Sequence, residues 1–509
     1  MKWRLTSLAA LAAVLFAGLA AMPSQADGHT LHQGCVESVP EPDGTAVEIC
    51  YTLYQPARAS SSAPVPLVFH SHGWGGSRTN SETAFGSWLS NGFAVLSFDQ
   101  RGFGESGGQA HIEDPDFEGQ DVQALVDLVA GLDWVVQDAP GDPRIGAIGG
   151  SYGGGYQFVG AFTDLMETGS TRFDALAPEI TWWDLQESLA PSGVVRTAWV
   201  TALFAAGAAS LPSEVQLAFV EGTATGEWPD GSLGIADMVA FFDNNGPRWH
   251  VDHGRRLDIP VLFGQGITDN LFNLNHGLKN FEQALTPSAR AESIFVGYNG
   301  GHALPNALPP ASLPSGDPCS TAIVGGSFAD LSLRFFQEQL KGEDHGLAAW
   351  GGTYNLATNG GACLQLGTAT GAPTPFSLGD VVTTTGVGGP QHVKIADGPI
   401  TVAGTPTVEA DVTPLAVDAR AFFALSVGTT AADAMVVQAN MMPIHEHDTL
   451  PGSTNHRSIE LPAVAVEVPA GQSLFLTVSP LSDMSFGHGS RTPGGLILSD
   501  TEAIVPVVG

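Results

Sequence analysis

The sequence predicts an α/β domain followed by an all-β sandwich, and three observations support this prediction. Between Pro66 and Val296, short apolar β-rich runs alternate with stretches of helical periodicity, a pattern typical of a parallel sheet with helices on both faces. From about residue 181 to 250, tryptophans and alanine-rich helical stretches interrupt the strand rhythm and indicate an inserted helical cap. After about Gly351, Thr, Val and Gly rise and helical periodicity disappears, which favours short strands in a sandwich.

The parallel sheet should contain several buried strands. Each is a short apolar run, and in chain order they are Leu67–Phe69, Phe93–Phe98, Ile145–Ile148, Ile259–Phe263 and Ser293–Val296. Between the second and third strands, apolar residues recur at helical spacing from Val122 to Leu132. A proline-rich connection from Ala303 to Gly326 should be irregular, and the helix after it should end near Gly342.

The C-terminal part shows the two-residue period of half-buried strands. Apolar and polar residues alternate at Val408–Val412, Phe423–Val427 and Leu474–Val478, between Pro and Gly turns. The expected organisation is therefore a signal peptide at residues 1–26, a catalytic domain at 27–350 and a C-terminal β-sandwich at 351–509.

Composition excludes several classes of protein. The chain has 509 residues, of which 43% are hydrophobic, so wholesale disorder is excluded. The 19 basic and 52 acidic residues give a net charge of −33. Such a surface repels phosphate backbones and anionic lipids, so neither a nucleic acid nor a membrane surface is an expected partner.

The N-terminus has the features of a secretory signal. Lys2 and Arg4 precede an apolar run of 15 residues, Leu8 to Met22, and cleavage is expected after Ala26. The alternative is a membrane anchor, but this run is shorter than the ~20 residues that span a bilayer. The mature protein is therefore expected to be soluble and either secreted or periplasmic.

The cysteines suggest two disulfides. The chain contains Cys35, Cys50, Cys319 and Cys363, and an even number in an oxidising compartment favours pairing over reduced, buried thiols. Three connectivities are possible, and the pairs Cys35–Cys50 and Cys319–Cys363 close the shortest loops. Because no C-x-x-C pair is present, a thiol-based zinc site or redox motif is not expected.

The sharpest chemical signal is Gly149-Gly150-Ser151-Tyr152-Gly153. It fits G-x-S-x-G, with a predicted strand before it and a predicted helix after it. That context is required of a nucleophile elbow, in which a tight turn raises the serine above the sheet. The alternative is an ordinary glycine-rich turn. The sequence therefore predicts Ser151 as a nucleophile.

A nucleophilic serine needs a base, and the base needs an orienting acid. Asp269 and His302 each follow a predicted strand, in the chain order Ser, Asp, His that this kind of elbow uses. Both should therefore lie at the same edge of the sheet as Ser151. Asp269 could also cap a helix that starts at Leu271. His276 is a competing candidate for the base, but it falls inside that helix and so does not lie at the edge of the sheet.

Backbone N–H groups should stabilise the oxyanion. One is expected from Tyr152, the residue after the nucleophile, and the other from Trp74 in the glycine-rich loop after the first strand. His70 and His72 in this loop resemble a metal pair, but structural hydrogen bonds are the favoured role.

A second histidine cluster also invites a metal interpretation. It is His445-Glu446-His447-Asp448, which does not fit H-E-x-x-H, and neighbouring residues on a strand face opposite ways. We expect a solvated loop there and no metal site.

Together these residues resemble an α/β-hydrolase. The motifs are His72–Gly76, Asp99–Ser106 and the Ser151 elbow. With Gly150–Gly154, the helix end Leu340–Gly342 and the C-terminal β domain, the chain more closely resembles the X-Pro dipeptidyl-peptidase family of serine hydrolases and its cocaine-esterase-like (CocE/NonD) acyl-hydrolase branch. The resemblance implies an α/β-hydrolase fold with an inserted helical cap and a C-terminal jelly-roll-like sandwich, whose opening strand matches Gly404–Val408.

Two features depart from the family pattern. Cocaine-esterase-like members carry a tyrosine in the early loop that assists the oxyanion, whereas the aligned segment here offers Trp74. A hole made of two backbone amides is therefore expected. No segment matches the long N-terminal domain of the true X-Pro dipeptidases.

The predicted function is a secreted serine hydrolase that cleaves acyl ester or amide bonds, namely a carboxylesterase or acyl esterase acting on a small-molecule or peptide acyl substrate without a cofactor. Ser151 attacks, His302 removes its proton and Asp269 orients His302. The residues expected in the substrate pocket are Trp182, Trp183, Asp184 and Trp199, although the two adjacent tryptophans could equally pack in the core.

Two alternatives are considered, one within enzymes and one from another class of protein. A dipeptidyl-type aminopeptidase would need a carboxylate in the cap for the free amine of its substrate, for which Asp184 and Glu187 are candidates. A non-catalytic binding protein on a hydrolase scaffold would use the β domain to hold a polymer, but the intact triad order argues against it.

Overall fold

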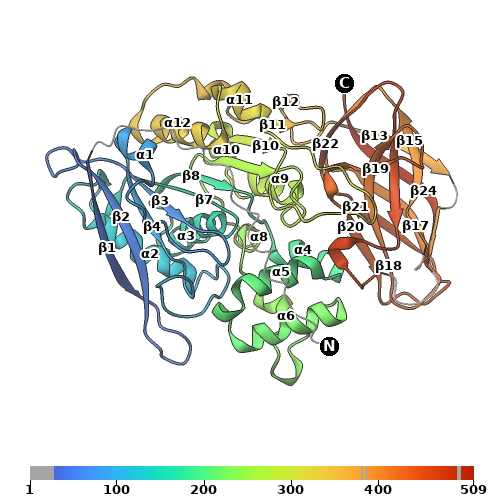
Figure 1. Ribbon diagram of the computed structural model, residues 1–509, viewed down its shortest axis with the longest axis horizontal. Helices are drawn as coiled ribbons and strands as arrows, with labels where there is room; N and C mark the ends of the chain where they lie inside the picture. The colour runs from blue at the N-terminus through green and yellow to red at the C-terminus, as the bar shows by residue number, and fades with distance from the viewer. Residues whose placement is uncertain (1–27, 380–381, 386–387, 490–494) are drawn as a thin grey trace, which may run out of the picture.

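The computed structural model describes residues 28–379, 382–385, 388–489 and 495–509. It divides into a layered α/β part and a C-terminal β-rich part, which lie on opposite sides of the view in Figure 1. The expected α/β core and C-terminal β-rich region are both confirmed. The predicted signal peptide, residues 1–26, lies outside the described residues.

A ten-stranded sheet forms the centre of the α/β part, in the order β1-β2-β4-β3-β7-β8-β9-β10-β11-β12. The strands are β1 (His29–Ser38), β2 (Val47–Pro56), β3 (Leu67–Ser71), β4 (Ala94–Phe98), β7 (Ile145–Gly150), β8 (Phe173–Glu179), β9 (Leu262–Gly266), β10 (Ile294–Tyr298), β11 (Tyr354–Ala357) and β12 (Cys363–Leu366). β3 is parallel to β4 and β7, and β10 is parallel to β9 and β11. The strands at the two edges, β1 with β2 and β11 with β12, pair antiparallel.

The predicted strands are present, although β9 begins at Leu262 rather than Ile259. Sequence reasoning missed β8, because Asp174 and Pro178 interrupt its apolar run. Asp174 is tied into the sheet by its carboxylate, which accepts a hydrogen bond of 2.8 Å from the N–H of Ile145. A polar residue in a strand can thus hide a buried strand from pattern analysis.

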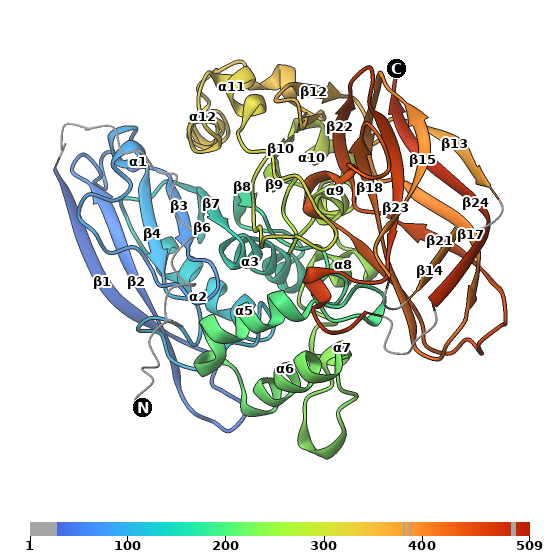
Figure 2. The ribbon, with the colours of Figure 1, turned by 45° about the vertical axis from the view of Figure 1, so that its right-hand side comes forward.

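Helices cover both faces of this sheet. Side chains such as Phe69, Phe263 and Phe295 pack against α2 (Glu118–Ala130), α3 (Tyr152–Thr168) and α9 (Leu274–Gln283). Their strand neighbours Val68 and Leu262 point to the other face and pack against α12 (Phe328–Lys341), since successive residues of a strand face opposite ways. Figure 2 shows α12 and α3 on opposite sides of the sheet.

Between β8 and β9 the chain leaves the sheet and forms a helical insertion. Its helices are α4 (Leu185–Leu189), α5 (Thr197–Gly207), α6 (Ser213–Thr225), α7 (Met238–Phe241) and α8 (Pro247–Asp252). Apolar side chains of α4, α5, α6 and α7 form one cluster with Phe103, Ile112 and Tyr152. Since β7 ends at Gly150, two residues before Tyr152, the insertion packs over the carboxyl end of that strand.

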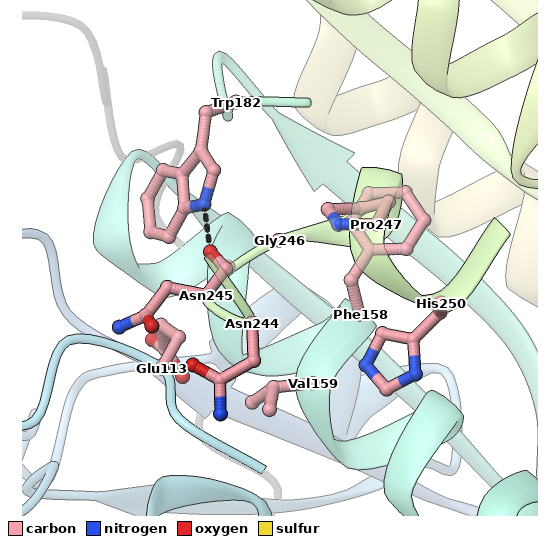
Figure 3. A pocket seen from close by; sticks show the side chains of 10 residues that line it. Glu113, Phe158, Val159, Trp182, Asn244, Asn245, Gly246, Pro247 and His250 are labelled. Carbon is pink, nitrogen blue, oxygen red and sulfur yellow. Dashed lines mark hydrogen bonds between the residues drawn. The ribbon is translucent and has the colours of Figure 1, made fainter. Parts of the chain in front are cut away.

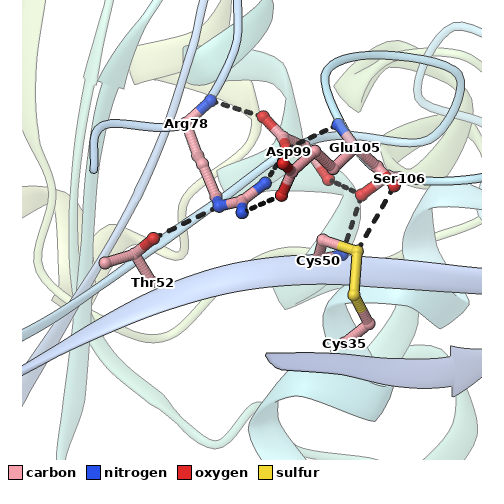
Figure 4. Close-up of a disulfide and its surroundings, with 7 residues drawn as sticks. All are labelled: Cys35, Cys50, Thr52, Arg78, Asp99, Glu105 and Ser106. Carbon is pink, nitrogen blue, oxygen red and sulfur yellow. Dashed lines mark hydrogen bonds and ion pairs between the residues drawn. A yellow bond between two sulfur atoms is a disulfide. The ribbon is translucent and has the colours of Figure 1, made fainter. Parts of the chain in front are cut away.

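Both local cysteine pairings are confirmed as disulfides. Cys35–Cys50 joins directly opposed residues of β1 and β2, and Cys319–Cys363 joins α11 (Pro318–Val324) to β12. Figure 4 shows how the first disulfide adjoins a buried polar network. The N–H of Cys50 donates to Ser106 Oγ at 2.8 Å, and Ser106 Oγ donates to the carbonyl oxygen of Asp99 at 2.7 Å. This network fixes the loop after β4.

The intact mass of the protein isolated from an oxidising compartment is expected to lie about 4 Da below the fully reduced value, because each of two disulfides removes two hydrogens. Thiol titration of the unfolded, unreduced protein is the second measurement. Four reactive thiols in that titration would contradict the two pairings.

Two sheets make up the C-terminal region. One has the order β21-β17-β24-β16-β22, with β13 and β14 also paired to β24, and the other has the order β15-β23-β18-β19, with β20 paired to β18. The strands are β13 (Ala372–Gly379), β14 (Val382–Thr385), β15 (Gln391–Asp397), β16 (Ile400–Gly404), β17 (Thr407–Pro414), β18 (Ala419–Gly428), β19 (Met435–Val436), β20 (Met442–Glu446), β21 (Asn455–Glu460), β22 (Val464–Val468), β23 (Ser473–Ser479) and β24 (Gly495–Val508). A cluster that includes Val408, Phe423 and Leu476 draws on both sheets.

The C-terminal region also packs against the helical insertion. Phe422 and Ala424, which face away from the cluster between the sheets, form a small apolar cluster with Val194 of the insertion. This contact explains why β18 is buried along nearly its whole length. In the described part of the chain, no helix is both long and apolar enough to cross a membrane.

Candidate active site

The predicted nucleophile, Ser151, lies in a tight turn between β7 and α3. Its backbone has φ 58° and ψ −124°, a conformation that non-glycine residues rarely adopt and that occurs where function requires it. A Cβ on Gly149 would lie 2.4 Å from the carbonyl oxygen of Gly153, and a Cβ on Gly153 would lie 2.6 Å from that of Ser71. Both glycines are therefore required by close backbone contacts, as the G-x-S-x-G pattern predicts.

Asp269 and His302 come together from the loops after β9 and β10. His302 Nδ1 lies 2.7 Å from Asp269 Oδ2, and the N–H of His302 donates to the same oxygen at 2.9 Å. Asp269 Oδ1 accepts from the N–H groups of Leu271 and Phe272, at 2.9 and 2.7 Å. An ionised carboxylate only accepts hydrogen bonds, so His302 Nδ1 carries the proton and its Nε2 remains free to act as a base.

The suggestion that Asp269 caps a helix starting at Leu271 is wrong. Helix α9 begins at Leu274, with Asn273 in the N-cap position. The carboxylate of Asp269 is instead used by the loop, where it accepts from two loop N–H groups and from His302. His276 lies within α9, as expected.

Sequence reasoning missed Asn270 as part of this site. The N–H of Asn270 donates to the carbonyl oxygen of His302 at 2.8 Å, and its side-chain oxygen accepts from Trp199 Nε1 at 2.9 Å. The carbonyl oxygen of Asn270 accepts from the buried Arg196 guanidinium at 2.6 Å. Burial lowers the pKa of Arg196 to about 10. The helical insertion thus supports the loop that carries Asp269.

The glycine-rich loop after β3 approaches the nucleophile closely. A Cβ built on Gly73 would lie 3.7 Å from Ser151 Cβ. The indole of Trp74 packs edge-on against Tyr152, with ring centroids 5.1 Å apart, and its Nε1 donates to the carbonyl oxygen of Leu203 at 2.9 Å. The side-chain N–H of Trp74 is therefore engaged with the helical insertion.

His70 near the end of β3 and His72 in the loop that follows both make structural hydrogen bonds. His72 Nε2 accepts from the N–H of Gln100 at 3.1 Å, so its Nδ1 carries the proton that is donated to the carbonyl oxygen of Gly73 at 2.9 Å. His70 Nδ1 lies 3.0 Å from Ser97 Oγ. Burial lowers the pKa of both histidines, that of His70 to about 4. Both rings are therefore neutral and serve to hold the loop.

An apolar cavity lies beside Ser151. It is lined by Trp74, Ile112, Ser151, Tyr152, Trp182, Leu185, Leu189, Leu203, Phe219 and Phe272. None of these side chains carries a charge. Phe272 also packs edge-on against His302, with ring centroids 5.3 Å apart. The cavity therefore adjoins both the predicted nucleophile and the predicted base.

A second, smaller cavity shares Trp182 as a wall, and Figure 3 shows its lining. The indole N–H of Trp182 donates to the carbonyl oxygen of Asn245 at 2.6 Å. Glu113 is buried at this cavity, and neither of its carboxylate oxygens has a hydrogen-bond partner among the described residues. Burial raises the pKa of Glu113 well above its usual range. Ser151 does not line this second cavity.

The predicted pocket residues have different environments. Trp182 lines the apolar cavity, whereas Trp183 packs in the main core, which corrects its placement in the pocket. Trp199 packs edge-on against His302, with ring centroids 5.9 Å apart, and does not line the cavity. Asp184 does not line the cavity either, because its side chain caps α4 and forms an ion pair of 2.5 Å with Arg248.

The expectation of a solvated loop at His445–Asp448 is also corrected. His445 and Glu446 belong to strand β20, and the side chain of Glu446 is buried and paired with Arg457. Within the described residues, one group has the spacing of metal ligands, namely Glu227, Asp418 and His445. Both carboxylates pair with the buried Arg420, which already supplies a positive charge there. None of these three residues lines the cavity beside Ser151.

Comparison with known proteins identifies the family. The family model of the X-Pro dipeptidyl-peptidases (S15 family) matches residues 43–303, just over half of the chain. The chain therefore belongs to this family of hydrolases.

Solved structures share this fold along almost the whole chain. A CocE/NonD family hydrolase from Staphylococcus aureus has a TM-score of 0.66 at 14% identity, and the match covers 94% of each chain. An aminopeptidase from a marine sediment thaumarchaeon also has a TM-score of 0.66, at 13% identity, with 97% of this chain and 99% of that chain covered. An α-amino acid ester hydrolase has a TM-score of 0.60 at 13% identity, over 96% of this chain and 98% of that chain.

Curated relatives match over shorter segments. The quorum-quenching protein AidA of Acinetobacter baumannii is 32% identical over 125 residues, which is 24% of this chain and 38% of that protein. An uncharacterised protein of Escherichia coli is 35% identical over 103 residues, which is 19% of this chain and 33% of that protein. The chain thus spans about a third of the length of these relatives.

Proposed function

We propose that the protein is a secreted serine hydrolase that cleaves carboxylic esters with an apolar acyl group. The observation on which this rests most is the 2.7 Å contact between His302 Nδ1 and Asp269 Oδ2, at the sheet edge that also presents Ser151. That contact leaves His302 Nε2 as the base. Ser151, His302 and Asp269 then form the catalytic triad.

The reaction proceeds through an acyl-enzyme. His302 Nε2 takes the proton of Ser151 Oγ as the oxygen attacks the ester carbonyl, and the tetrahedral intermediate forms. His302 then gives this proton to the leaving alcohol as the bond between the carbonyl carbon and the alkoxy oxygen breaks. Water repeats the sequence on the acyl group and releases the acid and free Ser151.

The backbone N–H groups of Tyr152 and Trp74 stabilise the oxyanion. Tyr152 is the first residue of α3, and the first N–H groups of a helix have no partner within it. Gly73 lies close to Ser151, so the loop after β3, which also contains Trp74, adjoins the serine. The side chain of Trp74 is engaged with Leu203, so the donor from this residue is its backbone amide.

Charge at the cavity favours an ester over a peptide with a free amino group. The cavity beside Ser151 is lined by uncharged side chains. The two carboxylates considered for amine binding are already paired, Asp184 with Arg248 and Glu187 with Lys279, each at 2.5 Å. Neither offers an unpaired negative charge to a substrate ammonium, which argues against the dipeptidyl-peptidase alternative.

The proposal also assigns a role to each part of the chain. Residues 27–350 form the catalytic domain, the insertion at about 181–250 is its cap, and residues 351–509 form a jelly-roll-like sandwich. The apolar residues that the insertion contributes to the cavity support its role as a cap. Two disulfides and the N-terminal sequence support export to an oxidising compartment.

A substrate panel tests this proposal. The wild-type protein and Ser151→Ala are assayed on a series of p-nitrophenyl alkanoates and on Xaa-Pro p-nitroanilides. We expect kcat/KM for the best ester to exceed that for any Xaa-Pro amide by at least about 100-fold. Equal or better turnover of the amides would show that the protein is a peptidase.

The cavity should also set acyl length. Leu203→Ala enlarges the cavity wall, so we expect the ratio of kcat/KM for long over short alkanoates to rise by about tenfold, since each methylene in an apolar pocket is worth about 10- to 200-fold. Leu217→Ala is the matched control, because Leu217 on α6 is 53% exposed and does not line the cavity. An unchanged ratio in Leu203→Ala would place the acyl group elsewhere.

A further inference from the structure

A side chain of the C-terminal β-rich region contacts the loop that carries the proposed catalytic acid. Asn440 Nδ2 donates to the main-chain carbonyl oxygen of Asp269 at 2.6 Å, across 171 residues of sequence. Asn440 is 3% exposed. A short hydrogen bond in so dry an environment holds its partners firmly, because water cannot replace it.

This hydrogen bond fixes one end of the peptide group that joins Asp269 to Asn270. At its other end, the N–H of Asn270 donates to the carbonyl oxygen of His302 at 2.8 Å. The peptide plane is therefore held between Asn440 and the loop of the proposed base. The orientation of that plane sets the direction in which the carboxylate of Asp269 leaves the backbone toward His302.

Asn440 is itself held in place by a strained segment. Gln438 and Ala439 have positive φ angles of 57° and 53°, which cost energy in non-glycine residues and persist where the surroundings impose them. The buried side chain of Gln438 anchors the segment to β22, because its Nε2 donates to the carbonyl oxygen of Ala465 at 3.1 Å and its Oε1 accepts from the N–H of Ala465 at 3.4 Å.

A neighbouring contact joins the same two parts of the molecule. Met442 Sδ lies 3.7 Å from both Asn273 Nδ2 and an Nη of Arg196. Arg196 also donates to the carbonyl oxygen of Asn270. Residues 267–273, between β9 and α9, carry Asp269 and are called the acid loop here. This loop is therefore bounded by the helical insertion on one side and by the C-terminal region on the other.

We propose that Asn440 is a positioning residue for Asp269, so that the C-terminal β-rich region forms part of the machinery that aligns the triad. The inference rests on the proposed triad, in which His302 must face both Asp269 and Ser151. Misplacement of a catalytic group by about 1 Å can cost about 100-fold in rate. Asn440 therefore acts on kcat, without touching the substrate.

The test compares Asn440→Asp and Asn440→Ala with a matched control, Asn275→Ala. Asp has the shape of Asn but presents oxygen to the carbonyl of Asp269, and Ala removes the donor altogether. Asn275 on α9 is a buried amide at the same interface, where it donates to the carbonyl oxygen of Leu461 at 3.0 Å and accepts from the N–H of Ala463 at 2.7 Å. Its side chain makes none of the hydrogen bonds of the acid loop.

For both Asn440 variants we expect kcat to fall by about 10- to 100-fold with KM changed less than about twofold. The acid limb of the pH profile of kcat/KM should also move, because it reports the coupling of His302 to Asp269. Asn275→Ala should keep the wild-type kcat and pH profile, even if its melting temperature falls.

Wild-type kcat and pH profile in folded Asn440 variants would overturn the inference. A loss of kcat that Asn275→Ala shares, in proportion to its lower melting temperature, would also overturn it, because docking of the β region would then explain the effect. Failure of both Asn440 variants to fold beside a folded Asn275→Ala would count against it as well. Substantial activity in Ser151→Ala would instead refute the triad itself, independently of Asn440.

Discussion

Ser151→Ala is expected to lower kcat by about 10⁴- to 10⁶-fold, because the reaction then lacks its nucleophile and the covalent intermediate cannot form. The fold should be unchanged, since Ala is smaller than Ser and buries no new polar group. Initial rates on the best alkanoate ester measure the effect, and far-UV circular dichroism checks the fold.

Ser90→Ala provides the control for this substitution. Ser90 ends the short helix α1 (Gly86–Ser90) and is exposed, so its loss should leave kcat unchanged. More than a tenth of the wild-type turnover in Ser151→Ala would rule out this serine as the nucleophile.

The second large effect is expected for Asp269→Asn. One oxygen of Asp269 accepts from Leu271 and Phe272, and the other accepts from His302. If the amide of Asn keeps its oxygen on the two loop N–H groups, its NH₂ faces His302 Nδ1. The imidazole must then accept at Nδ1 and carry its proton on Nε2, where it cannot act as a base. We expect kcat to fall by about 10⁴-fold, as for the same tautomer error in serine proteases.

Asp258→Asn is the matched control, because Asp258 is an exposed carboxylate whose side chain accepts hydrogen bonds from Thr286 and Ser288, away from the Ser151 cavity. It should retain the wild-type kcat. A turnover in Asp269→Asn within about tenfold of wild type would show that Asp269 does not set the tautomer of His302.

Local steric rules explain why the tight turn that carries Ser151 could be predicted from the sequence. The turn at Ser151 needs glycines at 149 and 153, since Cβ atoms there would meet backbone oxygens. The two glycines and the serine lie within five consecutive residues, so this requirement can be recognised from the sequence alone. Asp269 and His302 could also be predicted, because each follows a strand of the same parallel sheet and their order along the chain fits the elbow.

Features made by distant segments could not be predicted. Asn440 meets Asp269 only through the packing of the C-terminal region. Trp182 and Trp183 are adjacent, but one lines the cavity and the other packs in the core, and no sequence pattern distinguishes the two positions. The region His445–Asp448 is polar in sequence, but its first two residues lie on a strand, and the carboxylate of Glu446 forms an ion pair with Arg457. Charge pairing can thus bury residues that would be expected at the surface.

The most direct test of the proposed catalytic serine is the site of covalent labelling by a fluorophosphonate. The wild-type enzyme is inactivated with the reagent, digested, and the modified peptide is sequenced by mass spectrometry. We expect one phosphonylated residue, Ser151. The extent of labelling should rise as esterase activity is lost, and Ser151→Ala should take up no label. Full inactivation with the label on another residue, or an active enzyme that takes up no label, would contradict it.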